Sequence, residues 1–80
     1  SYDKYANWPL GDGTPLIKAT KKQLLVEAEF HETQGKTMLA RATWFKALAV
    51  RMGDAETVGE AIDGEGIAAL YKEAHAEVEA

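Results

Sequence analysis

Cysteine is absent from this 80-residue sequence, so neither a disulfide nor a zinc site with thiolate ligands can stabilise it. A domain of this size buries only about 60–65% of the surface that its unfolded chain exposes. Small domains of this kind usually gain stability from a cross-link, a metal or a second subunit. The hydrophobic fraction of 46% is nevertheless that of a folded protein, and we expect residues 1–80 to form one domain.

Long apolar runs are also missing, because charged side chains such as Lys46 and Arg51 interrupt the hydrophobic stretches. No stretch approaches the roughly 20 apolar residues that are needed to cross a membrane. The first residues, Ser1 to Tyr5, show no apolar core of a secretory signal. We therefore expect no membrane contact and a cytoplasmic location.

Nucleophilic side chains are scarce. Ser1 is the only serine, and neither His31 nor His75 has a spacing that pairs it with a threonine. His31 follows Glu27 by four residues, which predicts an ion pair on one helix face. The di-iron pattern requires Glu and His three residues apart, and position 28 is alanine. We expect no catalytic residue, no metal and no cofactor, and hence a protein that is not an enzyme.

Two short segments imitate ligand-binding loops without meeting their requirements. Residues 35–37 match the end of a phosphate-binding loop, but the glycine needed five positions earlier is replaced by Phe30. Residues 54–65 have the length of a calcium loop, but Val58 stands where an oxygen ligand is required. We therefore predict neither a nucleotide site nor a calcium site.

Charge is distributed unevenly along the chain, whose net charge is −4. Residues 1–52 carry eight basic and five acidic side chains, a balance of +3. Residues 53–80 carry one basic and eight acidic side chains, a balance of −7. Either the two parts attract each other across the fold, or the acidic third faces a basic partner. The basic side chains are dispersed round the predicted helix axis, which disfavours nucleic-acid binding.

Residues 1–19 lack helical periodicity and contain both prolines of the chain. We interpret them as an irregular N-terminal arm with three aromatic side chains, Tyr2, Tyr5 and Trp8. These rings either pack on the protein's own helices or order only on a partner. We favour packing, because each aromatic side chain can bury about 150–250 Å².

A long helix is predicted over residues 21–52. Thr20 and Gln23 have the spacing of a capping box, which begins a helix at Lys21. Apolar side chains then occupy so much of the helix circumference that neighbours are needed on two sides. The rest of the chain can scarcely supply both, which predicts a second copy. Gly35 offers an alternative end to a first helix, but we favour one continuous helix.

Two further helices complete an all-α fold. Gly53 suits a helix end and Asp54 suits an N-cap, which predicts a short helix over residues 55–62. After another glycine-containing break, the apolar residues of 66–79 follow the spacing of one helix face. The fold class is therefore a small helical domain with a long central helix, a short helix and a C-terminal helix.

These features favour binding over catalysis. We expect a non-enzymatic protein–protein interaction module of the accessory or regulatory type, which forms a homodimer through the apolar faces of helix 21–52. The predicted contact residues are four apolar and six acidic side chains: Phe30, Trp44, Leu48, Met52, Glu56, Glu60, Asp63, Glu65, Glu73 and Glu77. Three alternatives stay open: an acidic mimic of nucleic acid that inhibits an enzyme, a small helix–turn–helix-like DNA-binding regulator, and a non-catalytic subunit of a larger assembly.

Overall fold

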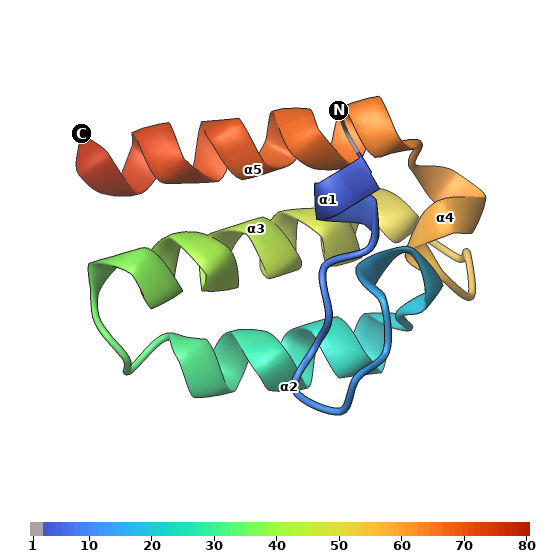
Figure 1. Cartoon of the computed structure of the whole chain (residues 1–80), viewed down its shortest axis with the longest axis horizontal. Coiled ribbons are helices and arrows are strands. Elements are labelled where there is room, and N and C mark those ends of the chain that lie inside the picture. The colour runs from blue at the N-terminus through green and yellow to red at the C-terminus, as the bar shows by residue number, and fades with distance from the viewer. Residues whose placement is uncertain (1–2) are drawn as a thin grey trace.

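The computed structural model describes residues 3–80 and confirms the all-α prediction (Figure 1). In chain order the elements are α1 (Asp3–Ala6), a 3-10 turn η1 (Leu16–Lys18), α2 (Lys21–His31), α3 (Lys36–Met52), α4 (Val58–Ala61) and α5 (Gly64–Glu79). Within the described residues, β-structure is limited to one isolated bridge between Pro9 and Pro15. Among residues 3–80, no helix combines the length and the apolar character that crossing a membrane would require.

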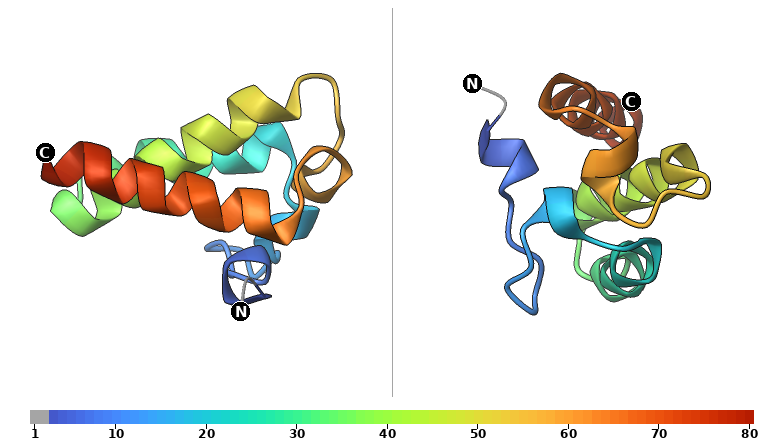
Figure 2. Two further views of the ribbon diagram at one scale, coloured as in Figure 1. Left: turned by 90° about the horizontal axis from the view of Figure 1, so that it is seen from above. Right: turned by 90° about the vertical axis from the view of Figure 1, so that its right-hand side faces the viewer.

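α3 is the central element of the fold. α2 runs antiparallel to it on one side and α5 packs on the other, as the views in Figures 1 and 2 show. Trp44, Phe45 and Leu48 of α3 are completely buried between these neighbours. The chain therefore covers the wide apolar circumference of α3 by itself. The sequence predicted a second copy because a continuous helix from 21 to 52 would have too much apolar surface for the rest of the chain to cover. That reason was wrong, because no such continuous helix forms.

The predicted continuous helix is broken at Gly35. α2 ends at His31, and α3 begins at Lys36. Gly35 has φ 107° and ψ 178°, a backbone conformation that is essentially restricted to glycine. This reversal places α2 beside α3, where Lys46 of α3 forms an ion pair with Glu32. The same apolar residues that seemed to need another molecule are thereby shared between two helices of one chain.

The N-terminal arm packs on the protein's own core. The rings of Tyr5 and Trp8 meet the Trp44 ring edge to face, with centroid separations of 6.2 and 6.0 Å. The Trp44 indole Nε1–H donates a hydrogen bond to the Ile67 carbonyl oxygen at 3.0 Å, which satisfies its buried polar group. Tyr2, the third aromatic residue of the predicted arm, lies outside the described residues.

Helix boundaries follow local signals more closely at some ends than at others. The capping box at Thr20 and Gln23 is present, so α2 begins where predicted. Asp54 is not an N-cap, because it lies in the turn that ends α3 and α4 begins only at Val58, whose amide donates to the Ala19 carbonyl. α5 begins at 64 rather than 66, because Asp63 caps it by accepting from the Gly66 amide.

The solvent-accessible surface area of the chain is 4799 Å². A compact monomer of 8.7 kDa is expected to expose about 4,700 Å². The fold therefore buries as much surface as a self-contained small domain. Only side chains that remain exposed are therefore available to contact another molecule.

The Gly35→Ala substitution tests the helix break by the sign of its effect. A Cβ at position 35 would meet no neighbouring atom, so only the backbone conformation matters. We expect the free energy of unfolding, measured with urea, to fall by about 1–3 kcal/mol. In a continuous helix the same change would raise it by about 1 kcal/mol. The control Thr37→Ala, at an exposed position in α3, should change it by less than about 0.7 kcal/mol.

Candidate functional site

A groove lies between residues 8–12 of the arm and α2; we call it the arm groove. It consists of two adjoining hollows with volumes of about 260 and 500 Å³, which share Leu10 and Glu27 in their linings. Val26 lines the first hollow, and Phe30, one helical turn further along α2, lines the second. The arm groove therefore follows α2 for at least one turn, about 6 Å.

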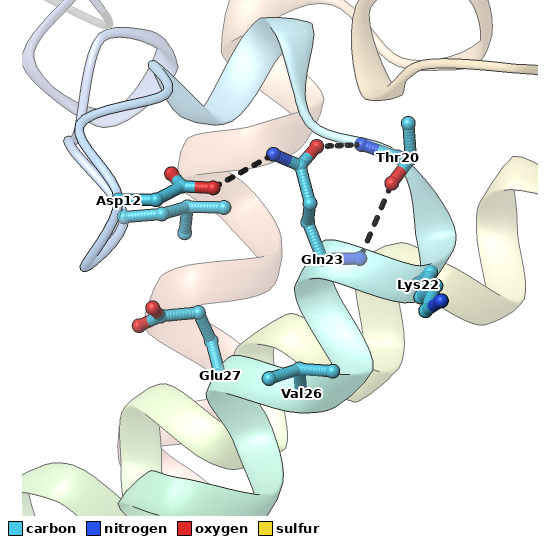
Figure 3. A pocket seen from close by; sticks show the side chains of 7 residues that line it. Asp12, Thr20, Lys22, Gln23, Val26 and Glu27 are labelled. Atoms are coloured by element: carbon cyan, nitrogen blue, oxygen red, sulfur yellow. Dashed lines mark hydrogen bonds between the residues drawn. The ribbon is translucent and has the colours of Figure 1, made fainter.

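Hydrogen bonds fix the arm at the first hollow (Figure 3). The Gln23 side-chain amide donates to Asp12 Oδ2 and to Thr14 Oγ1, both at 3.0 Å. The Gln23 side-chain oxygen accepts from the Thr20 amide at 2.8 Å, which belongs to the capping box. One residue thus begins α2 and holds the arm. Asp12 Oδ1 also accepts from the Thr14 amide at 2.9 Å.

Glu27 separates the two hollows, and both of its carboxylate oxygens are engaged. Oε1 accepts from the Gly11 amide at 2.7 Å, and Oε2 lies 3.4 Å from His31 Nε2. The predicted pair of Glu27 and His31 is therefore present. It stands in the wall of the arm groove, with both side chains mostly buried.

Arg41 closes the second hollow from the side of α3. Its guanidinium carbon lies 4.6 Å from the centroid of the Trp8 ring, a cation–π contact. One terminal nitrogen of Arg41 donates to the Met38 sulfur at 3.5 Å, and sulfur is a weak acceptor. Arg41 Nε is buried without a hydrogen-bond partner, and so is His31 Nδ1. This hollow therefore combines aromatic walls with unsatisfied nitrogen atoms.

Exposed apolar side chains flank the arm groove. Val26 is 59% exposed and Phe30 is 65% exposed, although both are large enough to be buried in a core. Leu25, Leu39 and Val50 are also exposed, but none of them lines either hollow. Isolated exposed apolar residues are common on protein surfaces. Val26 and Phe30 differ because each borders a hollow on the same face of α2.

Of the four apolar contact residues predicted from the sequence, one is exposed and three are buried. Phe30 lies at the arm groove. Trp44 and Leu48 are fully buried, and Met52 is 3% exposed, so these three cannot contact a partner of the folded domain. Their assignment as contact residues was wrong, because α2, α5 and the arm cover the face of α3 that carries them.

The six predicted acidic contact residues are all exposed and lie outside the arm groove: Glu56, Glu60, Asp63, Glu65, Glu73 and Glu77. Some of them have local roles. Glu60 accepts from the Glu56 amide at 3.0 Å, and Asp63 caps α5. The ion pairs of the described chain, Glu27 with His31 and Glu32 with Lys46, both lie within residues 1–52, and neither joins the acidic third to the basic part. Close ion pairing therefore does not account for the charge asymmetry.

Sequence reasoning missed most residues of the arm groove. Arg41, Met38 and Val26 carry no distinctive motif, and they come together only because the chain reverses at Gly35 and the arm returns across α2. The spacing of Thr20 and Gln23 pointed to a helix start, but it gave no sign that Gln23 would also hold Asp12.

Asp12 supplies a prediction about pH. Hydrogen bonds from the Thr14 backbone, the Thr14 side chain and Gln23 lower the pKa of its carboxyl below the usual 3.8. A lowered pKa stabilises the folded state above pH 3.8, and this contribution is lost as the pH falls through the folded-state pKa. Asp12→Asn should therefore lower the melting temperature at pH 7, by a margin that shrinks below pH 3.8. A margin that is constant with pH, or matched by the exposed-site control Asp54→Asn, would contradict this role.

Comparison with known proteins identifies no relative of this chain. No protein-family model, no curated protein and no solved structure matches it. The feature that bears on function is the arm groove, whose second hollow is lined by two side chains with a nitrogen atom that lacks a hydrogen-bond partner, His31 and Arg41.

Proposed function

We propose that this chain is a non-enzymatic protein–protein interaction module that binds a segment of a partner protein in the arm groove. The observation that carries the proposal is the exposure of Val26 and Phe30 beside the two hollows of a domain whose interior is already complete. An apolar segment placed there would remove from water apolar surface that the chain leaves exposed. The favourable transfer free energy is about 25 cal/mol per Å² of apolar area.

The shape of the arm groove favours a polypeptide segment. Val26 and Phe30 are separated by one helical turn, so side chains spaced by about 6 Å on a bound segment could reach both hollows. An amphipathic helix offers this spacing at positions i and i+4. The volumes of about 260 and 500 Å³ suit separate side chains better than one large cofactor.

The expected partner is a different protein rather than a second copy. The apolar circumference of residues 21–52, which would favour a homodimer in a continuous helix, is shared between α2 and α3 and covered by α5 and the arm. The exposed acidic side chains of α5, Glu73 and Glu77 among them, lie outside the arm groove and favour a partner with positive charge around its docking segment. They would act on the rate of encounter more than on the final contact.

Selection from a random peptide library tests this proposal. The folded protein is immobilised, and peptides that it enriches are titrated against variants. We expect the enriched peptides to carry apolar side chains, and we expect Phe30→Ser to weaken them at least about tenfold, as is usual for a central apolar contact residue. Val26→Ser should weaken them as well, because it borders the neighbouring hollow.

Val50→Ser is the matched control, because Val50 is 79% exposed and lies outside both hollows. Peptide affinity should be unchanged in this variant, and circular dichroism should show that all three variants stay helical. Peptides that respond to Val50 but ignore Phe30 and Val26 would overturn the proposed docking site. A library that yields no enriched peptide would count against a peptide-binding function.

A further inference from the structure

The second hollow of the arm groove contains an unusual shortage of hydrogen-bond partners. Over residues 3–80, the only buried side-chain nitrogen or oxygen atoms without a partner are His31 Nδ1 and Arg41 Nε. Both residues line this hollow. Buried polar groups are paired in the great majority of native proteins, and each exception calls for an explanation such as a ligand. Both atoms are covered in this structure, so an occupant of the hollow can supply a partner to them only where a covering side chain such as Met38 moves aside.

What the hollow lacks is a strong acceptor for Arg41. The nearest carboxylate in its lining, Glu27, already uses one oxygen for the Gly11 amide and the other for His31 Nε2. The Met38 sulfur accepts from Arg41, but a thioether is a weak acceptor and a poor match for a guanidinium. Because an arginine side chain only donates, a stronger acceptor has to come from outside the chain.

Arg41 is held beside Trp8 at a position that suits a carboxylate. Its guanidinium carbon lies over the Trp8 ring, and the donors of a guanidinium point outward from the edge of its plane. A carboxylate matches this edge with two parallel hydrogen bonds. His31, held by Glu27 through Nε2, brings a second unpartnered nitrogen, Nδ1, to the same hollow. Met38 is flexible and half-buried, so its side chain can yield to the incoming group.

We propose that the Arg41 end of the arm groove is a subsite for a carboxylate of the bound partner segment, supplied by an Asp or Glu side chain next to an apolar residue. The aromatic walls, Trp8 and Phe30, would hold the apolar neighbour and lower the local dielectric around the ion pair. This inference rests on the proposed protein-binding function and specifies the chemistry of the partner.

Two capped peptides that differ in one group test the subsite. ¹⁵N-labelled protein is titrated with acetyl-Phe-Glu-amide and with acetyl-Phe-Gln-amide, and the Arg41 Nε–Hε resonance is followed by NMR. We expect the Glu peptide to shift this resonance to saturation, and we expect the Gln peptide to bind at least about tenfold more weakly, because a carboxylate forms two charge-assisted hydrogen bonds with a guanidinium, whereas the Gln amide offers one neutral oxygen.

Variants separate the subsite from general packing. Arg41→Lys keeps the charge but loses the planar edge, so it should weaken the Glu peptide at least about tenfold and leave the Gln peptide little changed. Met38→Leu removes the competing sulfur at similar size, and it should keep or raise the affinity for the Glu peptide. Thermal unfolding reports whether Arg41→Lys remains folded; the peptide comparison on the unmodified protein does not depend on that variant.

Three outcomes would overturn the subsite. If neither peptide moves any resonance of Arg41 or Phe30 at millimolar concentration, the hollow does not accept such a segment. If both peptides bind equally and shift Phe30 while the Arg41 resonance stays still, the carboxylate is wrong but docking at the arm groove stands. If free phenylacetate shifts Arg41 and the capped Glu peptide does not, the site serves a small organic acid, and the partner-segment origin of the carboxylate is excluded.

Discussion

The indole of Trp44 lies where α3, α5 and the N-terminal arm meet, and the relative positions of all three depend on it. Its Nε1–H is satisfied by the Ile67 carbonyl of α5, and its ring receives Tyr5 and Trp8 from the arm. Truncation of a buried tryptophan typically costs about 3–5 kcal/mol, which is comparable with the whole stability of a marginal small domain. A chain without disulfides has few other means of fixing an irregular arm.

The same contact determines the shape of the arm groove. Trp8 packs on Trp44 and also forms a cation–π contact with the Arg41 guanidinium. Burial of Trp44 therefore positions Trp8, and Trp8 in turn orients Arg41 at the rim of the second hollow. At the other end, Gln23 and Glu27 hold the loop of the arm by hydrogen bonds to Asp12 and Gly11. The arm groove is thus a consequence of how the arm is attached, with aromatic packing at one end and polar contacts at the other.

Local signals in the sequence predicted what depends on neighbouring residues alone. The spacing of Thr20 and Gln23 was sufficient to place the start of α2, because a capping box needs only four residues. The break at Gly35 was harder to predict, because a glycine within an apolar helical pattern is compatible both with a tolerated cost of about 1 kcal/mol and with a reversal. Tertiary packing decides between a continuous helix and a reversal. The free energy gained when α2 covers a face of α3 depends on residues far apart in the sequence, so a local pattern does not reveal it.

Trp44, Leu48 and Met52 were wrongly assigned as contact residues because residues 21–52 were predicted to form one continuous helix. A helix of 32 residues would present more apolar circumference than the remaining segments could cover, whereas two antiparallel helices cover one another. Phe30 stayed exposed because it borders the hollow between the arm and α3, and neither of them covers its side chain. The arm groove could not be predicted from periodicity, since Trp8, Phe30 and Arg41 belong to three different segments.

Polar satisfaction in the arm groove is one-sided, and this asymmetry gives the surface its chemical preference. Its carboxylates, Asp12 and Glu27, are satisfied by groups of the same chain, so their oxygens already accept hydrogen bonds. Arg41, which lines the second hollow, donates to the Met38 sulfur and lies over the Trp8 ring. Adding a donor to this groove would compete with existing bonds, whereas adding an acceptor would complete one that is missing. The carboxylate subsite that we propose would thus be a position of local positive charge in a chain whose overall charge is negative.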